Sequence, residues 1–285
     1  MPRKLEMDSL EELILSGCSK IEKLPEFGEN MKSLSLLSVE NCINLLSLPN
    51  SISNVKYLRK LYMSGCSRIS TLPDGMNEIE SLEELDVTGT AIREIPSSKV
   101  RLEILRELSF GGRTEIAPKS QNLFQWISKF MGKPDLQESI VPPLSSLLAL
   151  ESLDLSYQDL TDESIPSDLG ALSLLKELNL GGNNFVNPPA QCIISLSKLH
   201  SVFFNDCPRL ESLPMLPPNL QALDTTNCPK LKPFHLDEDT LWKIFESHSQ
   251  EDPVCFLYTP SSSPFSPLLL SYNFYLVIYT IYFTP

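Results

Sequence analysis

The stretch "LEELDVTGTAIREIP", from Leu82 to Pro96, decides the fold of this 285-residue chain. Its pattern is L-x-x-L-x-L-x-x-(N/C/T)-x-(L/I)-x-x-(L/I)-P, in which leucine and other apolar residues recur at fixed positions. The same pattern occurs nine times, in copies that begin at Leu10, Leu34, Leu58, Leu82, Leu105, Leu150, Leu175, Leu199 and Leu220. Neighbouring copies start 21 to 25 positions apart, except for one gap of 45 positions after Leu105.

A repeat of this length and pattern predicts a leucine-rich-repeat solenoid. One copy cannot bury its own apolar face, whereas stacked copies bury a continuous core. In each copy the x-L-x-L-x segment is expected to form a short parallel strand whose leucines point inward. Prolines such as Pro73 follow in most copies, and the chain should turn there because proline fixes φ and lacks an N–H donor.

The predicted fold class is therefore α/β: a horseshoe-shaped solenoid with a parallel β-sheet on its concave face. The convex face is expected to carry short helices and irregular turns. The segments "NSISNVKYL" at 50–58 and "DGMNEIESL" at 74–82 fit helices of one or two turns on that side.

The chain divides into four parts. We expect a short polar lead-in at 1–9 and an array of about nine repeats at 10–233, with an insertion at 111–149. An acidic segment follows at 234–260, and an apolar tail at 261–285. The uncharged run of this tail is shorter than the roughly 20 residues of a membrane-spanning helix. It fits a truncated or disordered terminus best, with a strand of an incomplete domain and a membrane anchor as alternatives.

The insertion contains large apolar residues at helical spacing. They are Leu123, Phe124, Trp126, Ile127, Phe130 and Met131. This spacing predicts an amphipathic helix, which either packs on the flank of the solenoid or serves as a docking element for a partner.

The first repeat begins without a recognisable capping unit, which solenoids normally need at each end. We therefore expect the N-terminal face of the first repeat to expose part of its apolar core. Either the chain is a fragment or this face docks against another domain; the alternative is that residues 1–9 suffice as a cap.

Charge and cysteine usage narrow the class of partner and the compartment. The net charge of −13 disfavours binding to nucleic acid and to acidic membranes, and it permits a basic protein partner. Five of the seven cysteines occupy the ninth position of the repeat, which predicts a ladder of small buried side chains: Cys18, Cys42, Cys66, Cys207 and Cys228. The absence of a signal peptide and of N-x-S/T sites favours a cytoplasmic, possibly nuclear, location.

The sequence contains no phosphate-binding loop, no dinucleotide-binding glycine motif and no nucleophile elbow. Its three histidines lie in different regions, and no cysteine pair has zinc-site spacing. We therefore predict no catalytic, cofactor-binding or metal-binding residues.

The concave face is the candidate protein-binding surface, because residues that flank the buried leucines of each strand point into the curve. Eight of these residues are acidic and one is basic. The candidate residues are Glu12, Glu40, Lys60, Tyr62, Glu84, Asp86, Glu107, Asp154, Glu177, Asn179, Phe203 and Asp224. Tyr62 and Phe203 are expected to be exposed aromatics of the type that dominates binding energy. The face then either docks a basic protein patch or merely keeps the array soluble.

Several stretches resemble one known family. "LEELILSGCSKIEKLPEFGENMKSL", "LKELNLGGNNF" and "LPPNLQALDTTNCPKL" are similar to the leucine-rich-repeat region of plant intracellular immune receptors that carry a Toll/interleukin-receptor-like domain. The resemblance covers roughly residues 5–233 and implies recognition of a pathogen effector or a guarded host protein. It also implies that the repeats hold a nucleotide-binding domain, in cis or in trans, inactive.

The sequence matches neither the Toll-like nor the nucleotide-binding domain of those receptors, so their functional residues map to no position here. A stand-alone adaptor or decoy is the alternative function. A substrate-recognition arm of a ubiquitin-ligase complex is a further one.

Overall fold

The computed structural model describes residues 2–92, 104–112, 147–165, 167–188 and 193–232. The predicted insertion helix, the acidic segment at 234–260 and the apolar tail lie outside these residues.

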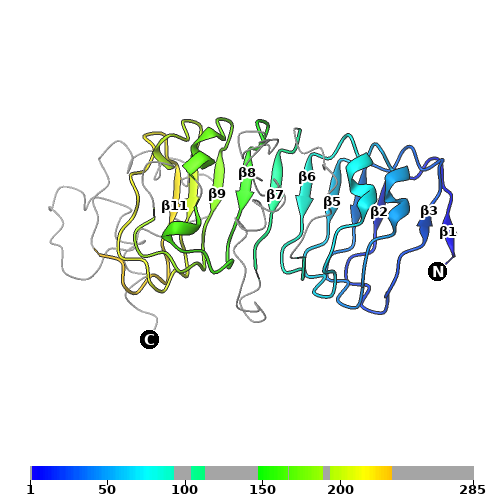
Figure 1. Cartoon of the computed structure of the whole chain (residues 1–285), viewed down its shortest axis with the longest axis horizontal. Helices are drawn as coiled ribbons and strands as arrows, with labels where there is room; N and C mark the ends of the chain where they lie inside the picture. Colours follow the sequence, from blue (N-terminus) through cyan, green and yellow to red (C-terminus); the bar gives the residue numbers. More distant parts are fainter. Residues whose placement is uncertain (1, 93–103, 113–146, 166, 189–192, 233–285) are drawn as a thin grey trace, which may run out of the picture.

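Nine parallel strands form one continuous sheet along the molecule (Figure 1). Each strand has three residues and comes from one copy of the repeat. The strands are β2 (Glu12–Ile14), β4 (Leu36–Ser38), β5 (Lys60–Tyr62), β6 (Glu84–Asp86), β7 (Glu107–Ser109), β8 (Ser152–Asp154), β9 (Glu177–Asn179), β10 (Ser201–Phe203) and β11 (Ala222–Asp224). They follow one another in chain order, as expected for a leucine-rich-repeat solenoid.

The register of the sheet places the fourth position of every repeat side by side. Leu61 of β5 pairs with Leu37 and Leu85 of its neighbours. The same register joins β7 to β8, where Leu108 pairs with Leu153 although 113–146 intervene in the sequence. The long gap after Leu105 therefore does not interrupt the sheet.

The core consists of the leucine positions of successive repeats. In the third repeat Leu58, Leu61 and Met63 are fully buried, and the corresponding residues of most other copies are also buried. Burying an aliphatic side chain of this size contributes roughly 1.5–3 kcal/mol. The predicted inward-facing positions are thus confirmed.

The convex side carries short 3₁₀ turns. They are η1 (Asn50–Asn54), η2 (Asp74–Glu78), η4 (Asp162–Ser164) and η5 (Ser167–Ala171). Pro49 and Pro73 directly precede η1 and η2 in extended conformation. A Cβ atom on Gly75 would lie 2.3 Å from the carbonyl oxygen of Asn50, so only glycine lets η2 approach η1 this closely. The elements η1 and η2 lie where the sequence predicted short helices.

The N-terminal end of the solenoid is covered on one side only. Strand β1 (Lys4–Leu5) pairs in parallel with β3 (Glu26–Phe27) on the side away from the main sheet, as the right-hand end of Figure 1 shows. The core positions of the first repeat remain partly exposed: Leu10, Leu13, Leu15 and Ile21. Their counterparts in the second repeat are fully buried: Leu34, Leu37, Val39 and Leu45.

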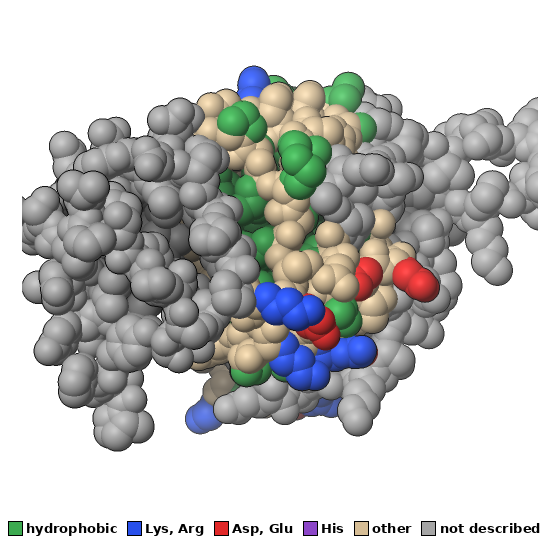
Figure 2. Space-filling model, turned by 90° about the vertical axis from the view of Figure 1, so that its left-hand side faces the viewer, with side chains coloured by type: hydrophobic (Ala, Val, Ile, Leu, Met, Phe, Trp, Pro, Cys, Tyr) green, Lys and Arg blue, Asp and Glu red, His purple; other side chains and the backbone are tan. Residues whose placement is uncertain are grey.

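The expectation of a partly exposed first repeat is therefore confirmed on the sheet side. Within the lead-in, Lys4–Leu5 adds one short strand beside Glu26–Phe27 of the first repeat. At the opposite end, seen in Figure 2 from the β11 side, apolar side chains form a narrow strip, and basic and acidic side chains lie near its lower end.

Candidate functional site

The sheet carries almost all of the residues predicted for the concave face. Eleven of the twelve belong to its strands, and Glu40 follows β4. Glu12, Glu107 and Glu177 are exposed, whereas the other nine are partly buried. Tyr62 and Phe203 belong to the second group, so the expectation of two exposed aromatics is wrong.

Four of these residues have a structural role that the sequence analysis missed. They occupy the fifth position of the repeat, where the strand ends, and their side-chain oxygens accept the backbone N–H two residues later. Asp86 accepts from Thr88 at 2.8 Å, and Asp154 accepts from Ser156 at 2.8 Å. Asn179 and Asp224 do the same at 3.0 and 2.8 Å. This is the hydrogen bond of an Asx-turn, which shapes the exit from the strand.

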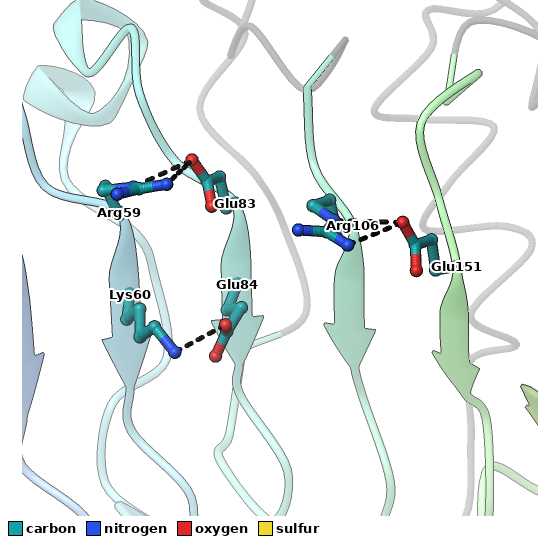
Figure 3. A network of polar contacts seen from close by, with 6 residues as sticks. All are labelled: Arg59, Lys60, Glu83, Glu84, Arg106 and Glu151. Carbon is teal, nitrogen blue, oxygen red and sulfur yellow. Dashed lines mark hydrogen bonds and ion pairs between the residues drawn. The ribbon is translucent and has the colours of Figure 1, made fainter.

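Lys60, Tyr62 and Glu84 form a compact network between β5 and β6. The ammonium of Lys60 lies 2.7 Å from one carboxylate oxygen of Glu84, as Figure 3 shows, and the Tyr62 hydroxyl donates to the other oxygen. Burial and the bond to Glu84 raise the pKa of Tyr62. Partial burial opposes ionisation of Glu84, but the hydrogen bonds from Lys60 and Tyr62 hold its pKa below the ordinary value. The charge of Glu84 is therefore already neutralised locally.

Glu40 is held by serine hydroxyls from three repeats. Ser38 donates to its carboxylate at 2.8 Å, Ser64 at 3.1 Å and Ser16 at 3.4 Å. Ser16 and Ser38 also contact each other at 2.7 Å. This part of the concave face is thus a fixed polar network.

Three carboxylates remain available. Within the described residues, the side chains of Glu12, Glu107 and Glu177 make no hydrogen bond or ion pair. All three occupy the third position of the repeat, and Glu84 pairs with Glu107 in the sheet register. Partial burial and then repulsion by Glu84 raise the pKa of Glu107, with a further contribution from Glu177. The uncompensated negative charge of the face therefore lies in this row.

Tyr157 is a further feature that sequence reasoning missed. It has a positive φ of 54° at the eighth position of the repeat, where Gly65, Gly89 and Gly182 also have positive φ. A Cβ atom on Gly182 would lie 2.1 Å from the Tyr157 ring, so the ring occupies the space above this glycine. The hydroxyl donates to Asp206 at 2.5 Å. A tyrosine among the glycines, asparagines and aspartate of this position was the signal in the sequence.

A row of alternating charges lies just before the strands, at the second position of the repeat. We call Arg59, Glu83, Arg106, Glu151 and Lys176 the edge row. Arg59 pairs with Glu83 at 2.7 Å and Arg106 with Glu151 at 2.8 Å (Figure 3). Lys176 reaches Glu151 from the other side at 2.5 Å. The hydrogen bonds from Lys176 and Arg106 lower the pKa of Glu151, and the bond to Glu151 raises that of Arg106.

The described residues offer no alternative kind of site. Among them, no group of three or more His, Cys, Asp or Glu side chains is arranged to hold a metal ion. No helix in this part of the chain has the length and apolar character needed to cross a membrane. The sheet, its register and its polar face define a leucine-rich-repeat solenoid.

Comparison with known proteins narrows this class. No protein-family model matches the chain. It is 35% identical over 150 residues to TMV resistance protein N of Nicotiana glutinosa, which covers 53% of this chain and 11% of that protein. It is 31% identical over 226 residues to the disease resistance-like protein DSC1 of Arabidopsis thaliana, which covers 78% of this chain and 13% of that protein.

A solved structure supports the fold independently. A leucine-rich-repeat protein of Leptospira interrogans superposes with a TM-score of 0.55 at 21% identity, over 79% of this chain and half of the other. The chain is therefore a leucine-rich-repeat region of the type found in plant disease resistance proteins. It spans no more than 13% of the length of either relative.

Proposed function

We propose that this chain is a protein-recognition module of plant immunity that binds a basic surface of its partner through the concave face. The observation that carries this proposal is the row of carboxylates at Glu12, Glu107 and Glu177, which have no ion-pair partner among the residues that the structure describes. Partial burial and then repulsion by Glu84 raise the pKa of Glu107, and a partner cation placed near Glu107 would relieve this repulsion. The acidic face would also accelerate encounter with a basic protein.

The surroundings of these carboxylates favour binding over mere solubility. Asx-turns at Asp86, Asp154 and Asp224 fix the strand ends, and the three-residue strands are held in one sheet. The backbone that carries Glu12, Glu107 and Glu177 therefore loses little conformational entropy when a partner binds.

The relatives suggest which proteins are bound. Because both are resistance proteins, we propose a pathogen effector or a guarded host protein as the ligand. We further propose that the chain restrains a nucleotide-binding domain, in cis or in trans, until that ligand binds. The free thiols of Cys42, Cys66, Cys207 and Cys228 fit a reducing compartment, which supports action in the cytoplasm or nucleus.

Paired charge-neutralising variants test the concave face. The first carries Glu12→Gln, Glu107→Gln and Glu177→Gln; the control removes the same charge elsewhere through Glu22→Gln, Glu78→Gln and Glu163→Gln, all exposed residues away from the sheet. Proteins captured from pathogen-challenged plant tissue would be quantified by mass spectrometry. We expect basic partners to be lost with the concave variant and retained with the control. Equal capture by both variants would refute the proposal.

A further inference from the structure

In the edge row the basic side chains are more exposed to solvent than the carboxylates. The side chains of Arg59, Arg106 and Lys176 are 47 to 58% exposed, whereas those of Glu83 and Glu151 are only 23% and 24% exposed. The cations precede β5, β7 and β9, so they occupy every second strand of the sheet. The outer surface of this edge is therefore positive, although the concave face beside it is negative.

The guanidinium groups retain donors for a further ligand. Arg59 directs Nε and Nη2 at one oxygen of Glu83, and Arg106 directs the same two atoms at one oxygen of Glu151. Within the described part of the chain, Nη1 of either arginine has no recorded contact. A guanidinium can donate two N–H groups to one carboxylate, so each arginine can bind a second carboxylate.

Apolar side chains are exposed beside these cations. Tyr57, Ile104 and Leu148 lie in the turns that lead into β5, β7 and β8, and their side chains are 43 to 60% exposed. Three large apolar residues exposed in the turns of one edge are more than scattered surface residues. We call the set Tyr57, Arg59, Ile104, Arg106, Leu148 and Lys176 the edge strip.

We propose that the edge strip binds an amphipathic helix of a partner protein, with acidic residues at heptad spacing and apolar residues between them. Neighbouring strands are about 4.8 Å apart, so cations on alternate strands recur about every 10 Å. Seven residues of an α-helix rise about 10.5 Å and return to the same face of the helix. Apolar residues three or four positions on form a neighbouring stripe of the helix with the same repeat of about 10.5 Å, on the side of Tyr57, Ile104 and Leu148.

An extended segment fits this strip less well. It covers about 10 Å in three residues, and residues three apart in a strand point to opposite faces. A helix therefore matches the spacing of the cations and places an apolar stripe beside them. The inferred ligand has the opposite charge to the partner of the concave face and uses a different surface, so this inference does not depend on the proposed function.

The first test uses two model peptides on the unmodified chain. One is a labelled helical peptide of three heptads with one glutamate per heptad and leucines between; the other has the same composition with its glutamates out of heptad register. Fluorescence anisotropy should show at least roughly tenfold tighter binding of the in-register peptide, weakening as salt is added. Equal affinities for the two peptides, or binding of neither, would overturn the inference.

The second test locates the binding. Arg59→Gln, Arg106→Gln and Lys176→Gln together should weaken the in-register peptide roughly tenfold, and Tyr57→Ser, Ile104→Ser and Leu148→Ser together should do likewise. The control Lys20→Gln, Lys23→Gln and Lys230→Gln removes equal charge from exposed positions outside the strip and should change nothing. The concave variant with Glu12, Glu107 and Glu177 neutralised should also retain binding. Undiminished binding by either strip variant, or tighter binding of a single-stranded RNA oligomer than of the peptide, contradicts the proposal.

Discussion

At the scale of single residues, the ninth position of the repeat links each turn to the one before it. The Cys66 thiol donates to the carbonyl oxygen of Val39 in the preceding repeat at 2.9 Å, and the Cys42 thiol donates to Leu15 at 3.1 Å. Burial raises the pKa of the Cys66 thiol to about 11, so it stays protonated and able to donate at neutral pH. The predicted ladder is confirmed for four cysteines, whereas Cys18 in the open first repeat is exposed.

Asn183 performs the same role with more bonds. Its amide donates to the carbonyl oxygens of Leu155 and Leu180 at 3.0 and 2.8 Å and accepts from the backbone N–H of Gln158 and Leu160 at 3.0 Å. Asn183→Ala would leave these buried backbone groups unpaired, and we expect a loss of about 2–4 kcal/mol in the free energy of unfolding by urea. Asn184→Ala, next to it and bonded only at the surface to Asp159, should cost less than about 1 kcal/mol. Equal losses would contradict this role.

Variants of the aspartates at the fifth position can distinguish the contribution of the turn hydrogen bond from that of the negative charge. Asn179 already accepts the same backbone bond as Asp154, so charge is not required there. We expect Asp154→Asn to leave stability within about 0.5 kcal/mol of wild type, and Asp154→Ala to lower it by about 1 kcal/mol because Ser156 N–H loses its acceptor. Thermal or urea unfolding of the two variants measures the difference. A large loss in Asp154→Asn would show that the charge itself stabilises the fold.

Tyr157 makes stability depend on pH at the alkaline end. Burial, and then its bond to Asp206, raises the pKa of Tyr157 to about 12. A folded-state pKa above the unfolded value of about 10 means that the contribution is complete below pH 10 and is lost as pH rises through about 12. Tyr157→Phe should therefore lose less stability than wild type over this window. Urea unfolding and the absorbance of tyrosinate would both report it. The exposed Tyr57 is the control, since Tyr57→Phe should keep the wild-type slope.

At the scale of the repeat element, a residue with positive φ ends the strand-and-turn unit in eight of the nine repeats. Gly17, Gly65, Gly89 and Gly182 supply it with φ between 65° and 75°, and Asn41, Asp206 and Asn227 supply it elsewhere. Glycine adopts this conformation without strain, and asparagine and aspartate tolerate it. Tyr157 is the exception, and its strained backbone is held by a ring that packs over Gly182.

Two glycines separate the effect of backbone strain from that of steric clash. At Gly17 a Cβ atom would meet nothing within 4 Å, so Gly17→Ala should cost only the strain of positive φ, about 1–2 kcal/mol. At Gly182 the Cβ atom would also clash with the Tyr157 ring, and the loss should be about 1–3 kcal/mol greater. Unfolding free energies of both variants test this. If Gly182→Ala were no worse than Gly17→Ala, the ring would be free to move away.

The repeat pattern predicted the strands and the buried positions because those depend on contacts repeated in every copy. The short convex helices followed from the prolines and the distance to the next leucine, as at Pro49 and η1. The pattern did not reveal which carboxylates form ion pairs or hydrogen bonds, because these contacts depend on neighbours that differ between repeats. Glu84 is neutralised by Lys60 only because both lie at the third position of adjacent strands. Likewise, Asp86 was interpreted as free charge although it caps a turn.

At the scale of the whole molecule, the function was inferred from a family resemblance, and the relatives support it only as recognition in plant immunity. The residues that flank the buried leucines predicted an acidic face, and the structure divides that face into neutralised parts and a row at Glu12, Glu107 and Glu177 that makes no ion pair within the described residues. The positive outer surface of the edge row lies beside the concave face, and a partner would approach it from a different side. Two surfaces of opposite charge on one rigid sheet would allow two different partners to bind at once.

We have proposed that the concave carboxylates contact a basic protein. Carbodiimide cross-linking of the chain to a captured and purified partner tests it most directly, because the reagent joins carboxylates to lysine amines that touch them. We expect cross-links from Glu107 and Glu177 to partner lysines, identified by mass spectrometry and less abundant when salt is added. Cross-links confined to convex carboxylates such as Glu22, Glu78 and Glu163 would contradict it.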